Sequence, residues 1–431
     1  MATRSVLEKN PAFDAAIRFM EGDDPFVFVT GRAGTGKSTL LKEFRKTTKL
    51  KCAYLAPTGV AALNIEGETI HSFFRFSPGI TLFEAQHDGK EAPPQLYQSV
   101  DALVIDEISM VRADLMDCMD IFLRTVRRDK RPFGGVRVIA IGDLFQLPPV
   151  IRSDERTAFA DRYGTPYFFS SDVVRNLTDV GKVAFIELET VYRQRDKDFV
   201  SLLNTVRDRS MDAAQLNKLN DRVDGKLKGD AASYIYLTTT NAAADEVNDR
   251  RLKALSGKAV AYEGRTTGGF PERDMPTDAS LLLKKGARVM FVKNDGEGRW
   301  VNGTLGTVTK LNDVSVEVLT DDDETFTVSP TTWTLYRSAY DQKAKTLDQE
   351  KVGTFTQVPL RLAWAATIHK SQGKTFDKVI VDLGTGAFAA GQVYVALSRC
   401  RTLEGIVLAK PVMLRHLMMD ERVMEFMSGL M

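Results

Sequence analysis

Hydrophobic and polar positions in the first half of the chain form short apolar runs that each end in a glycine or polar turn. These runs are Phe26–Val29, Cys52–Leu55, Ala102–Ile105 and Val136–Ile141. Helix-compatible stretches, such as Thr39–Thr47 and Arg112–Arg127, lie between them. Alternating apolar strands and helices are typical of a parallel sheet covered on both faces. A similar series predicts a second such sheet and therefore two α/β lobes; its strands are Lys182–Leu188, Tyr234–Leu237 and Lys378–Leu383.

Two segments depart from this alternation. Residues 76–100 contain the turn-forming residues Pro78, Gly79, Pro93 and Pro94 and show little hydrophobic periodicity. This composition predicts a small excursion from the first sheet. Residues 269–359 contain alternating runs such as SVEVLT and ETFTVSP around the acidic turn DDDE, which predicts an inserted antiparallel β barrel. The predicted division is 1–75 with 101–178 for the first lobe, 76–100 and 269–359 for the insertions, and 179–268 with 360–431 for the second lobe.

Composition changes this picture in two ways. A chain of 431 residues exceeds what one hydrophobic core usually supports, in agreement with two lobes. Its 58 basic and 57 acidic residues give a net charge of +1, so a polyanion would have to bind in a local groove rather than to a globally positive surface. Three cysteines without metal-site spacing, and the lack of a long apolar run, favour a soluble protein in a reducing compartment and predict no membrane partner.

A phosphate-binding pattern, GxxxxGK[ST], occupies Gly31–Ser38 between a predicted strand and a predicted helix. In that context, backbone N–H groups surround phosphate oxygens, a lysine supplies a mobile positive charge and the final hydroxyl can bind Mg²⁺. A glycine-rich loop that binds nothing is the alternative. The residues expected to contact the nucleotide are Gly31, Ala33, Gly34, Thr35, Gly36, Lys37, Ser38 and Thr39.

Candidate partners for that loop follow the next two strands. Asp106 and Glu107 stand at a strand end in ALVIDEIS, where one carboxylate can hold a metal ion and the other can orient or deprotonate water. Two solvated turn acids are the alternative. Gln146 in AIGDLFQLPPV can contact a γ-phosphate or water, although an isolated glutamine in a turn is usually only a turn residue.

Eight segments in this order resemble the Pif family of superfamily-one helicases, with its RecD-like and phage Dda relatives. They extend from about Val27 to Cys400 and are GRAGTGKS, APTGVAALNIEGETIHSFF, VIDEISM, GDLFQLPP, LETVYRQRDKDFVSLLNTVR, TTTNAAADEVN, WAATIHKSQGKTFDKVIVDLG and GQVYVALSRC. The resemblance implies two RecA-like lobes that close on ATP. It also implies a wedge in residues 76–100 and an SH3-like barrel in residues 269–359.

The resemblance also implies roles at the nucleotide site. Lys37 and Ser38 would bind phosphates and Mg²⁺, Asp106 and Glu107 would handle metal and water, and Gln146 would sense the γ-phosphate. Arg193 and Arg399 would reach across from the second lobe, and Gly373 would line the site. Family members commonly carry a glutamine upstream of the glycine-rich loop to grip adenine; here Asn10 is the amide expected to make analogous contacts.

The tripeptide Thr-Ile-His occurs twice, at 69–71 and at 367–369. In the family, the surrounding segments line a single-stranded DNA track on opposite lobes, where hydroxyl and imidazole groups suit contacts that do not read sequence. Phe73, Phe74 and Trp364 could stack on bases, although an aromatic side chain at such spacing is more often core. The residues implied in DNA binding are Pro57, Thr58, Gly59, His71, Phe73, Thr367, His369, Lys370 and Ser371.

The predicted function is therefore an ATP-dependent 5′-to-3′ DNA helicase that acts on single-stranded, forked or structured DNA. A nucleotide-gated protein that clamps DNA or displaces bound proteins is the first alternative, and a P-loop kinase is the second. The resemblance implies work in DNA replication, repair, recombination, telomere maintenance or G-quadruplex processing. It implies a monomer or a dimer on DNA, in the cytoplasm of a bacterial or viral system or in a eukaryotic nucleus or mitochondrion.

Overall fold

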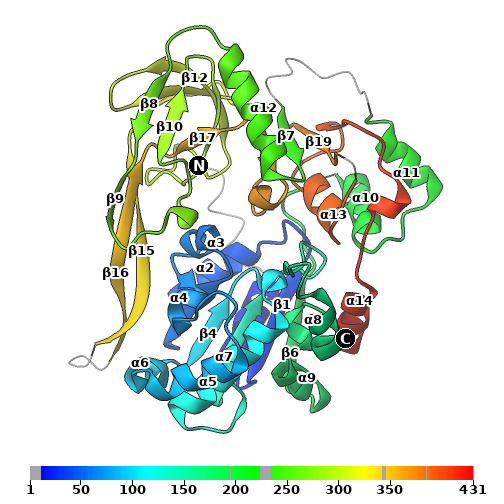
Figure 1. The fold of residues 1–431 in the computed structure, drawn as a ribbon. Helices are drawn as coiled ribbons and strands as arrows, with labels where there is room; N and C mark the ends of the chain where they lie inside the picture. Colours follow the sequence, from blue (N-terminus) through cyan, green and yellow to red (C-terminus); the bar gives the residue numbers. More distant parts are fainter. Residues whose placement is uncertain (1–10, 195, 224–233, 342–345, 385, 431) are drawn as a thin grey trace.

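The computed structural model describes residues 11–194, 196–223, 234–341, 346–384 and 386–430. Two helix-flanked sheets and a β-rich insertion divide the molecule (Figure 1). The first sheet lies at the bottom of that view, the second lies at the upper right, and the insertion lies at the upper left. None of the helices in these described ranges is long and apolar enough to cross a bilayer.

The first sheet is entirely parallel, and its strands are ordered β3-β2-β4-β5-β1-β6. Helices cover both faces, so every residue of β1 is buried. Val27 and Val29 pack in one core with α1 (Pro11–Glu21) and α2 (Lys37–Thr47), while Phe26 and Phe28 pack in another with α7 (Ala113–Arg127). The strands are β1 (Phe26–Gly31), β2 (Cys52–Ala56), β3 (Glu68–Thr69), β4 (Ala102–Ile105), β5 (Arg137–Ile141) and β6 (Val183–Leu188).

Strand β6 corrects one prediction. The run at 182–188 was expected to open the second sheet, yet β6 pairs in parallel with β1 along its whole length, from Val183 opposite Phe26 to Leu188 opposite Gly31. It is an edge strand and only half-buried over most of its length. An apolar run indicates a strand but carries no information about which sheet it joins, so the first lobe extends beyond residue 179.

The second sheet is also parallel, with the order β18-β7-β19-β20. It confirms the prediction of two parallel sheets. Its strands are β7 (Ile235–Thr238), β18 (Ala365–Thr367), β19 (Val379–Asp382) and β20 (Ile406–Leu408). Its helices are α10 (Lys197–Arg207), α11 (Ala213–Asn220), α12 (Asn241–Ala254) and α13 (Gln392–Leu397).

The C-terminal helix α14 (Glu421–Leu430) departs from the predicted second lobe. It returns to the first lobe, where the Phe426 ring stacks on Phe169 with centroids 4.4 Å apart and also contacts Phe28 and Phe168. Figure 1 shows α14 beside α8 (Arg156–Tyr163), below the second sheet. The segment 360–431 therefore does not belong wholly to one lobe, because an amphipathic helix carries no mark of the lobe that covers its apolar face.

The inserted antiparallel sheets are confirmed, but they begin and end outside 269–359. Strands β8 (Val260–Glu263) and β9 (Arg265–Gly268) pair with inserted strands, and so does β17 (Leu360–Leu362). We call residues 260–362 the β insertion. Its other strands are β10 (Ser280–Leu283), β11 (Arg288–Phe291), β12 (Leu305–Leu311), β13 (Val316–Thr320), β14 (Thr325–Val328), β15 (Thr331–Asp341) and β16 (Thr346–Gln357).

The expected excursion at residues 76–100 consists of two short helices. They are α5 (Leu82–Glu91) and α6 (Pro94–Ser99), and both pack on α7. The contact with α7 is close, because a Cβ added at Gly89 would lie 2.9 Å from the carbonyl oxygen of Phe122. A capping box at Thr81 and Glu84 begins α5.

Candidate nucleotide site and nucleic-acid interface

The glycine-rich loop joins β1 to α2 at the carboxyl edge of the first sheet. Gly34 and Gly36 have φ angles of +85° and +87°, which residues with a side chain rarely adopt. A Cβ added at Gly34 would also lie only 2.5 Å from the Cβ of Arg193. Lys37 Nζ donates to the carbonyl oxygens of Gly31, at 2.6 Å, and Arg32, at 3.1 Å. Burial lowers the pKa of Lys37, while Asp143 and Glu107 act in the opposite direction.

Two carboxylates face this loop from the end of β4. The ends of β4, β5 and β1 are neighbours in the sheet, so Asp106 and Glu107 lie on the same edge as the loop. Burial raises the pKa of both acids, and Lys37 acts against that rise. Glu107 also has a left-handed backbone, at φ 52°, a strained conformation that is common at functional sites.

Gln146 belongs to a buried polar group that follows β5. Its Nε2 donates to Asp143 Oδ2 at 3.2 Å, and Asp143 Oδ1 lies 3.5 Å from Nη2 of Arg207. The Arg207 guanidinium also stacks over the Phe145 ring, at 3.9 Å from its centroid. Asp143 and Arg207 were missed as site residues. Their sequence positions offer only a turn acid and a basic helix end, and the ion pair exists only in three dimensions.

Arg193 and Gln194 lie on the connector between β6 and α10. The Tyr192 N–H donates to the carbonyl oxygen of Gly34 at 2.9 Å, which holds this connector against the glycine-rich loop. Arg193 Nη1 donates to the Ser398 carbonyl at 3.2 Å, and Gln194 Nε2 donates to the same oxygen at 3.0 Å. Arg193 therefore does not reach over from the second sheet as expected, since it follows the last strand of the first sheet.

Arg399 does come from the second lobe, and it is buried. Its guanidinium donates to the carbonyl oxygens of Val395, at 2.9 Å, and Ser371, at 3.4 Å, and to Ser398 Oγ at 2.8 Å. Burial and then Arg193 lower its pKa to about 9, while Glu107 acts against that shift. Arg399 thus lies close enough to the phosphate side of the first lobe for its charge to be felt there.

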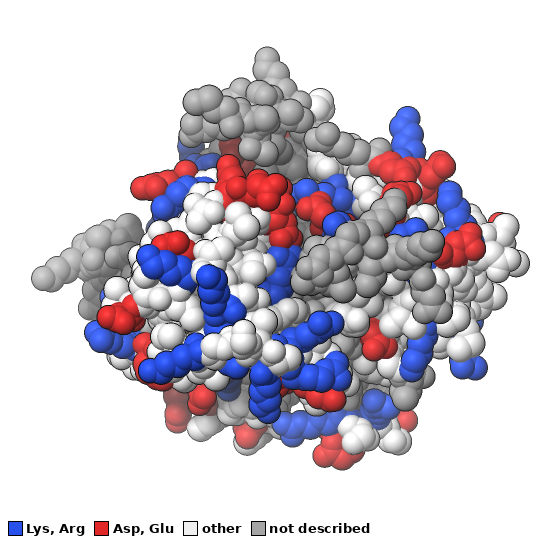
Figure 2. All heavy atoms as spheres, turned by 90° about the horizontal axis from the view of Figure 1, so that it is seen from above, with Lys and Arg blue, Asp and Glu red and all other residues white. Residues whose placement is uncertain are grey.

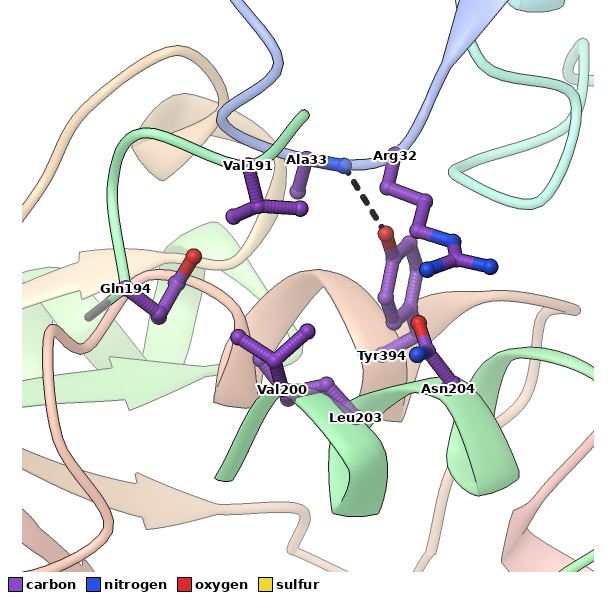
Figure 3. A pocket seen from close by; sticks show the side chains of 8 residues that line it. All are labelled: Arg32, Ala33, Val191, Gln194, Val200, Leu203, Asn204 and Tyr394. Carbon is purple, nitrogen blue, oxygen red and sulfur yellow. Dashed lines mark hydrogen bonds between the residues drawn. The ribbon is translucent and has the colours of Figure 1, made fainter. Parts of the chain in front are cut away.

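Tyr394 connects the two lobes directly, and sequence reasoning missed it. Its hydroxyl oxygen accepts a hydrogen bond from the backbone N–H of Ala33 at 2.9 Å (Figure 3). Beside it, Gly391 at the start of α13 lies against the Gln146 carbonyl, where a Cβ would come within 2.4 Å. Tyr394 lies in the same quoted segment as Arg399, but a buried tyrosine in an apolar helix gives no sign of a polar contact. The small cavity behind the loop is lined by Arg32, Ala33, Val191, Gln194, Val200, Leu203, Asn204 and Tyr394.

The β insertion packs against part of the first-lobe half of the expected DNA track, where Gly59 is buried while Thr58 stays exposed. Thr58 Oγ1 accepts from the Ala61 N–H at 3.3 Å and caps helix α3 (Gly59–Asn64). A Cβ at Gly59 would lie 2.2 Å from Oδ1 of Asp274, so this carboxylate sits directly on the turn. Nearby, Oε1 of the buried Glu68 accepts from the Ser338 N–H at 2.6 Å.

His71 lies beside this covered turn, on helix α4 (Ile70–Phe74), and is half-buried. Burial and then Arg273 of the insertion lower its pKa. Pro57 is partly exposed at the end of β2. The first lobe therefore presents a histidine and a capped turn to the insertion.

The second-lobe half of the track is a single turn after β18. Thr367 is buried and its Oγ1 accepts from the Lys370 N–H at 3.2 Å. Ser371 is fully buried and its Oγ donates to the Ile368 carbonyl at 2.7 Å, so the prediction that its hydroxyl faces DNA is wrong in this structure. His369 is half-buried with a pKa lowered by burial, and Lys370 is exposed.

Comparison with known proteins decides the family. Residues 7–217 match the family model described as PIF1-like helicase. The ATP-dependent DNA helicase Pif1 of Bdellovibrio bacteriovorus is 32% identical over 97% of this chain and 92% of that protein. The chain belongs to the PIF1-like helicase family. It is also 34% identical to the ATP-dependent DNA helicase PIF1 of Xenopus laevis over 92% of this chain, but spans only 62% of that protein's length.

Solved structures of a PIF1-like relative support the fold. The Pif1 of a Bacteroides species in complex with ADP-AlF4 is 35% identical, covers 97% of this chain and 96% of its own, and has a TM-score of 0.88. The same relative bound to single-stranded DNA covers the same shares at 34% identity, with a TM-score of 0.67. The two parallel sheets of the present chain are thus RecA-like lobes of a PIF1-like helicase.

The aromatic candidates of this PIF1-like chain are core residues. Phe73 and Phe74 are each only 1% exposed and pack with Tyr97 and Phe122 between α4, α6 and α7. Trp364 is 7% exposed and belongs to the core of the β insertion. The expectation that such aromatic side chains are more often core is therefore confirmed for all three, and the prediction that Phe73 contacts DNA is wrong in this structure.

Surface charge is local, as the near-zero net charge predicts. Figure 2 shows Lys and Arg side chains gathered in a band on the face seen from above, with Asp and Glu side chains gathered beside it. A nucleic acid would therefore be attracted to local basic regions of this PIF1-like chain rather than to its whole surface.

Donor atoms at the nucleotide site fit a magnesium ion. Ser38 is exposed in the first turn of α2, and Asp106 supplies a carboxylate at the end of β4. Oxygen donors are what Mg²⁺ prefers, usually with phosphate and water completing its shell. The described part of the chain contains no cluster of three or more His, Cys, Asp or Glu residues that could hold a metal on its own. Gly373 is exposed with φ +74°, and Asn10 lies outside the described residues.

Proposed function

We propose that this chain is an ATP-dependent 5′-to-3′ DNA helicase and single-stranded DNA translocase. The observation that carries the proposal is the hydrogen bond between the Ala33 N–H of the glycine-rich loop and the Tyr394 hydroxyl of the second lobe. It connects the phosphate-binding backbone of one RecA-like lobe to the helix that precedes Arg399 in the other. The turns expected to face DNA follow an edge strand in each lobe.

ATP binding rests on the first lobe. The loop backbone and Lys37 would hold the phosphates, with Gly34, Thr35 and Thr39 among the contacting residues. Mg²⁺, held by Ser38 and Asp106, would neutralise charge on the phosphate oxygens. Glu107 would accept a proton from the attacking water, a role that fits a partly buried carboxylate with a raised pKa. Gln146 would orient that water, since Asp143 already fixes its amide.

The two arginines would make hydrolysis depend on lobe position. Guanidinium groups placed beside the γ-phosphate stabilise the charge of the transition state. Both arginines already donate to Ser398 of the second lobe: Arg193 to its carbonyl oxygen and Arg399 to its hydroxyl oxygen. A change in the distance between the lobes would therefore move Arg399 relative to the phosphate and alter the hydrogen bond between Arg193 and Ser398, so hydrolysis would be coupled to lobe movement along DNA.

DNA would cross the turns that follow β3 and β18. His71, His369, Lys370, Thr58, Pro57 and Gly59 stay as the proposed contacts, joined by the backbone at Thr367 and Ser371. The Bacteroides relative bound to single-stranded DNA supports this partner. We also propose that residues 76–100 carry the strand-separating wedge and that the β insertion is SH3-like. Forked and structured DNA, G-quadruplexes included, would be the substrates in replication, repair, recombination or telomere maintenance.

DNA-stimulated ATP turnover tests the proposal. The rate of phosphate release is measured with ATP and Mg²⁺, with and without an oligothymidylate. We expect the single strand to raise the rate at least about tenfold, equivalent to about 1.4 kcal/mol of barrier. A rate of phosphate release that does not change when DNA is added would contradict the proposal and favour a P-loop kinase. A stimulated rate without strand separation on any tailed duplex would instead favour a clamp or protein-displacing ATPase.

A further inference from the structure

Lys374 lies where the second lobe meets the β insertion, just beyond the expected DNA-facing turn. Its side chain enters the insertion: Nζ lies 3.7 Å from the Sδ atom of Met290 on β11. On the insertion side, the Gly303 backbone lies close to the Lys374 stem, since a Cβ there would come within 3.5 Å of the Lys374 Cβ. A thioether sulfur is a weak hydrogen-bond acceptor, so this contact does little for an ammonium group.

Two further cations lie beside Lys374. Arg361 on β17 is directly opposite Met290 in the antiparallel pair with β11, and opposed residues in such a pair place their side chains on the same face. Lys370 belongs to the short 3₁₀ turn His369–Ser371 that precedes Lys374. Burial first, and then Arg361 and Lys370, lower the pKa of Lys374 to about 7. Three elements therefore bring three cationic side chains together.

This cluster has no close counter-charge within the described ranges. None of the three side chains forms an ion pair there, although many surface cations of the chain do. Asp245 and Asp278 act on Lys370, but from beyond ion-pair distance, and neither is among the groups that act on Lys374. Gathering like charges without a partner is unfavourable, and a bound anion would offset that cost.

We propose that Arg361, Lys370 and Lys374 form a phosphate-binding site between the second lobe and the β insertion, and that a backbone phosphate of single-stranded DNA occupies it. This proposal rests on the proposed function, because it takes the strand to pass over the Thr367–Ser371 turn. The site also adjoins the nucleotide side: the carbonyl oxygens of Ser371 and Lys374 both accept from Arg399 Nη1. DNA at this site would therefore hold the loop that positions Arg399.

The lowered pKa of Lys374 gives the site a distinctive signature. In the free protein, part of the Lys374 population is neutral above pH 7. A phosphate stabilises the ammonium form and raises its pKa, so DNA binding takes up a proton and affinity falls as pH rises above 7. Burial lowers the pKa of both His71 and His369, so their imidazoles are neutral over that range and contribute little to its pH dependence.

The test is the affinity of the full chain for a fluorescent oligothymidylate, measured by anisotropy between pH 7 and 8.5 and over a salt series. For the unaltered chain we expect affinity to fall roughly three- to tenfold over that pH range. Lys374→Arg should bind well without that fall, because arginine stays charged. Lys374→Met should bind about three- to tenfold more weakly and lose about 0.7 from the slope of log affinity against log salt.

Lys310→Met is the matched control, since Lys310 is exposed on β12 and pairs with Glu317 at 3.5 Å. It should behave like the unaltered chain. A Lys374→Met variant that melts normally and keeps the original salt slope and pH response would overturn the site. Proton uptake, measured calorimetrically in buffers of different ionisation enthalpy, should be lost in Lys374→Arg; uptake equal to that of the unaltered chain would also overturn it. An unaltered chain that fails to bind the oligothymidylate would contradict the proposed function instead.

Discussion

The proposed nucleotide site and the proposed DNA-facing turns differ in how their residues are held. At the nucleotide site, the ends of three neighbouring strands bring Lys37, Asp106 and Asp143 to one edge, and Tyr394 fixes the loop from the other lobe. At the proposed DNA-facing turns, hydroxyls cap their own backbone, aromatic rings are buried and the β insertion packs on part of the first-lobe turn. Chemistry fixed by strand order can be inferred from motifs, whereas contacts made by turn side chains depend on which way each one points.

The two Thr-Ile-His segments share one local structure and differ in what surrounds the histidine. In both, threonine Oγ1 accepts from the N–H three residues later, at 3.1 Å in the first copy and 3.2 Å in the second. In both, the isoleucine is fully buried and the histidine is half-buried after an edge strand. The tripeptide is thus first a strand-to-helix turn. The copies differ because Arg273 of the insertion acts on His71, whereas only burial shifts the pKa of His369.

Lys37→Ala should give the largest difference between the effect on ATP turnover and the effect on DNA affinity. Removing the phosphate-loop charge should lower ATP turnover by at least about a hundredfold. Affinity for single-stranded DNA, measured by anisotropy without nucleotide, should stay within about twofold because Lys37 is bonded only to its own loop. Equal loss of turnover and DNA affinity would show that the regions are not separate.

Glu107→Gln should come next. The amide keeps the shape of the carboxyl group but cannot accept the water's proton, so turnover should fall about a hundredfold or more while ATP still binds. Nucleotide affinity, followed with a fluorescent ATP analogue, is the control. Turnover at the original rate would remove Glu107 from the water-handling role.

Tyr394→Phe should have a smaller effect. It removes the acceptor for the Ala33 N–H, a loss of about 0.5–1.5 kcal/mol that corresponds to a roughly two- to tenfold lower turnover. Tyr262→Phe is a matched control, because its hydroxyl bonds only to the insertion backbone at Asn312 and Ser315. If both variants lose the same activity, the contact between lobes has no special part in turnover.

The smallest effect should come from the paired histidines. His71→Gln and His369→Gln should each weaken single-strand binding about twofold at pH 7.5, where both imidazoles are neutral because their pKa values are lowered. Affinity of the unaltered chain should rise further as pH falls through and below the ordinary histidine range, since a protonated imidazole attracts phosphate. If only one variant weakens binding, the two turns do not flank the same strand.

Much of the fold follows from the sequence, because buried parallel strands are apolar and each ends in a turn residue. Strand β6 and helix α14 were misplaced, since an apolar run or an amphipathic helix does not identify the lobe that it joins. At the nucleotide site, the loop and the acids after β4 could be placed by strand order alone. Asp143, Arg207 and Tyr394 could not, because their partners lie far away in sequence. Ser371 and Phe73 were misjudged because one lies in a single turn and the other in a helix of only 5 residues, and both are too short for a hydrophobic period that would show side-chain direction.

The most direct test of the account is unwinding of two matched duplexes in the presence of ATP and Mg²⁺, one with a 5′ single-stranded tail and one with a 3′ single-stranded tail. The account predicts that the strands separate from the 5′ tail, and that Lys37→Ala abolishes this while still binding the tail. Efficient separation from the 3′ tail alone would contradict the proposed direction. DNA-stimulated ATP turnover without separation of either duplex would contradict the proposal that this chain is a helicase.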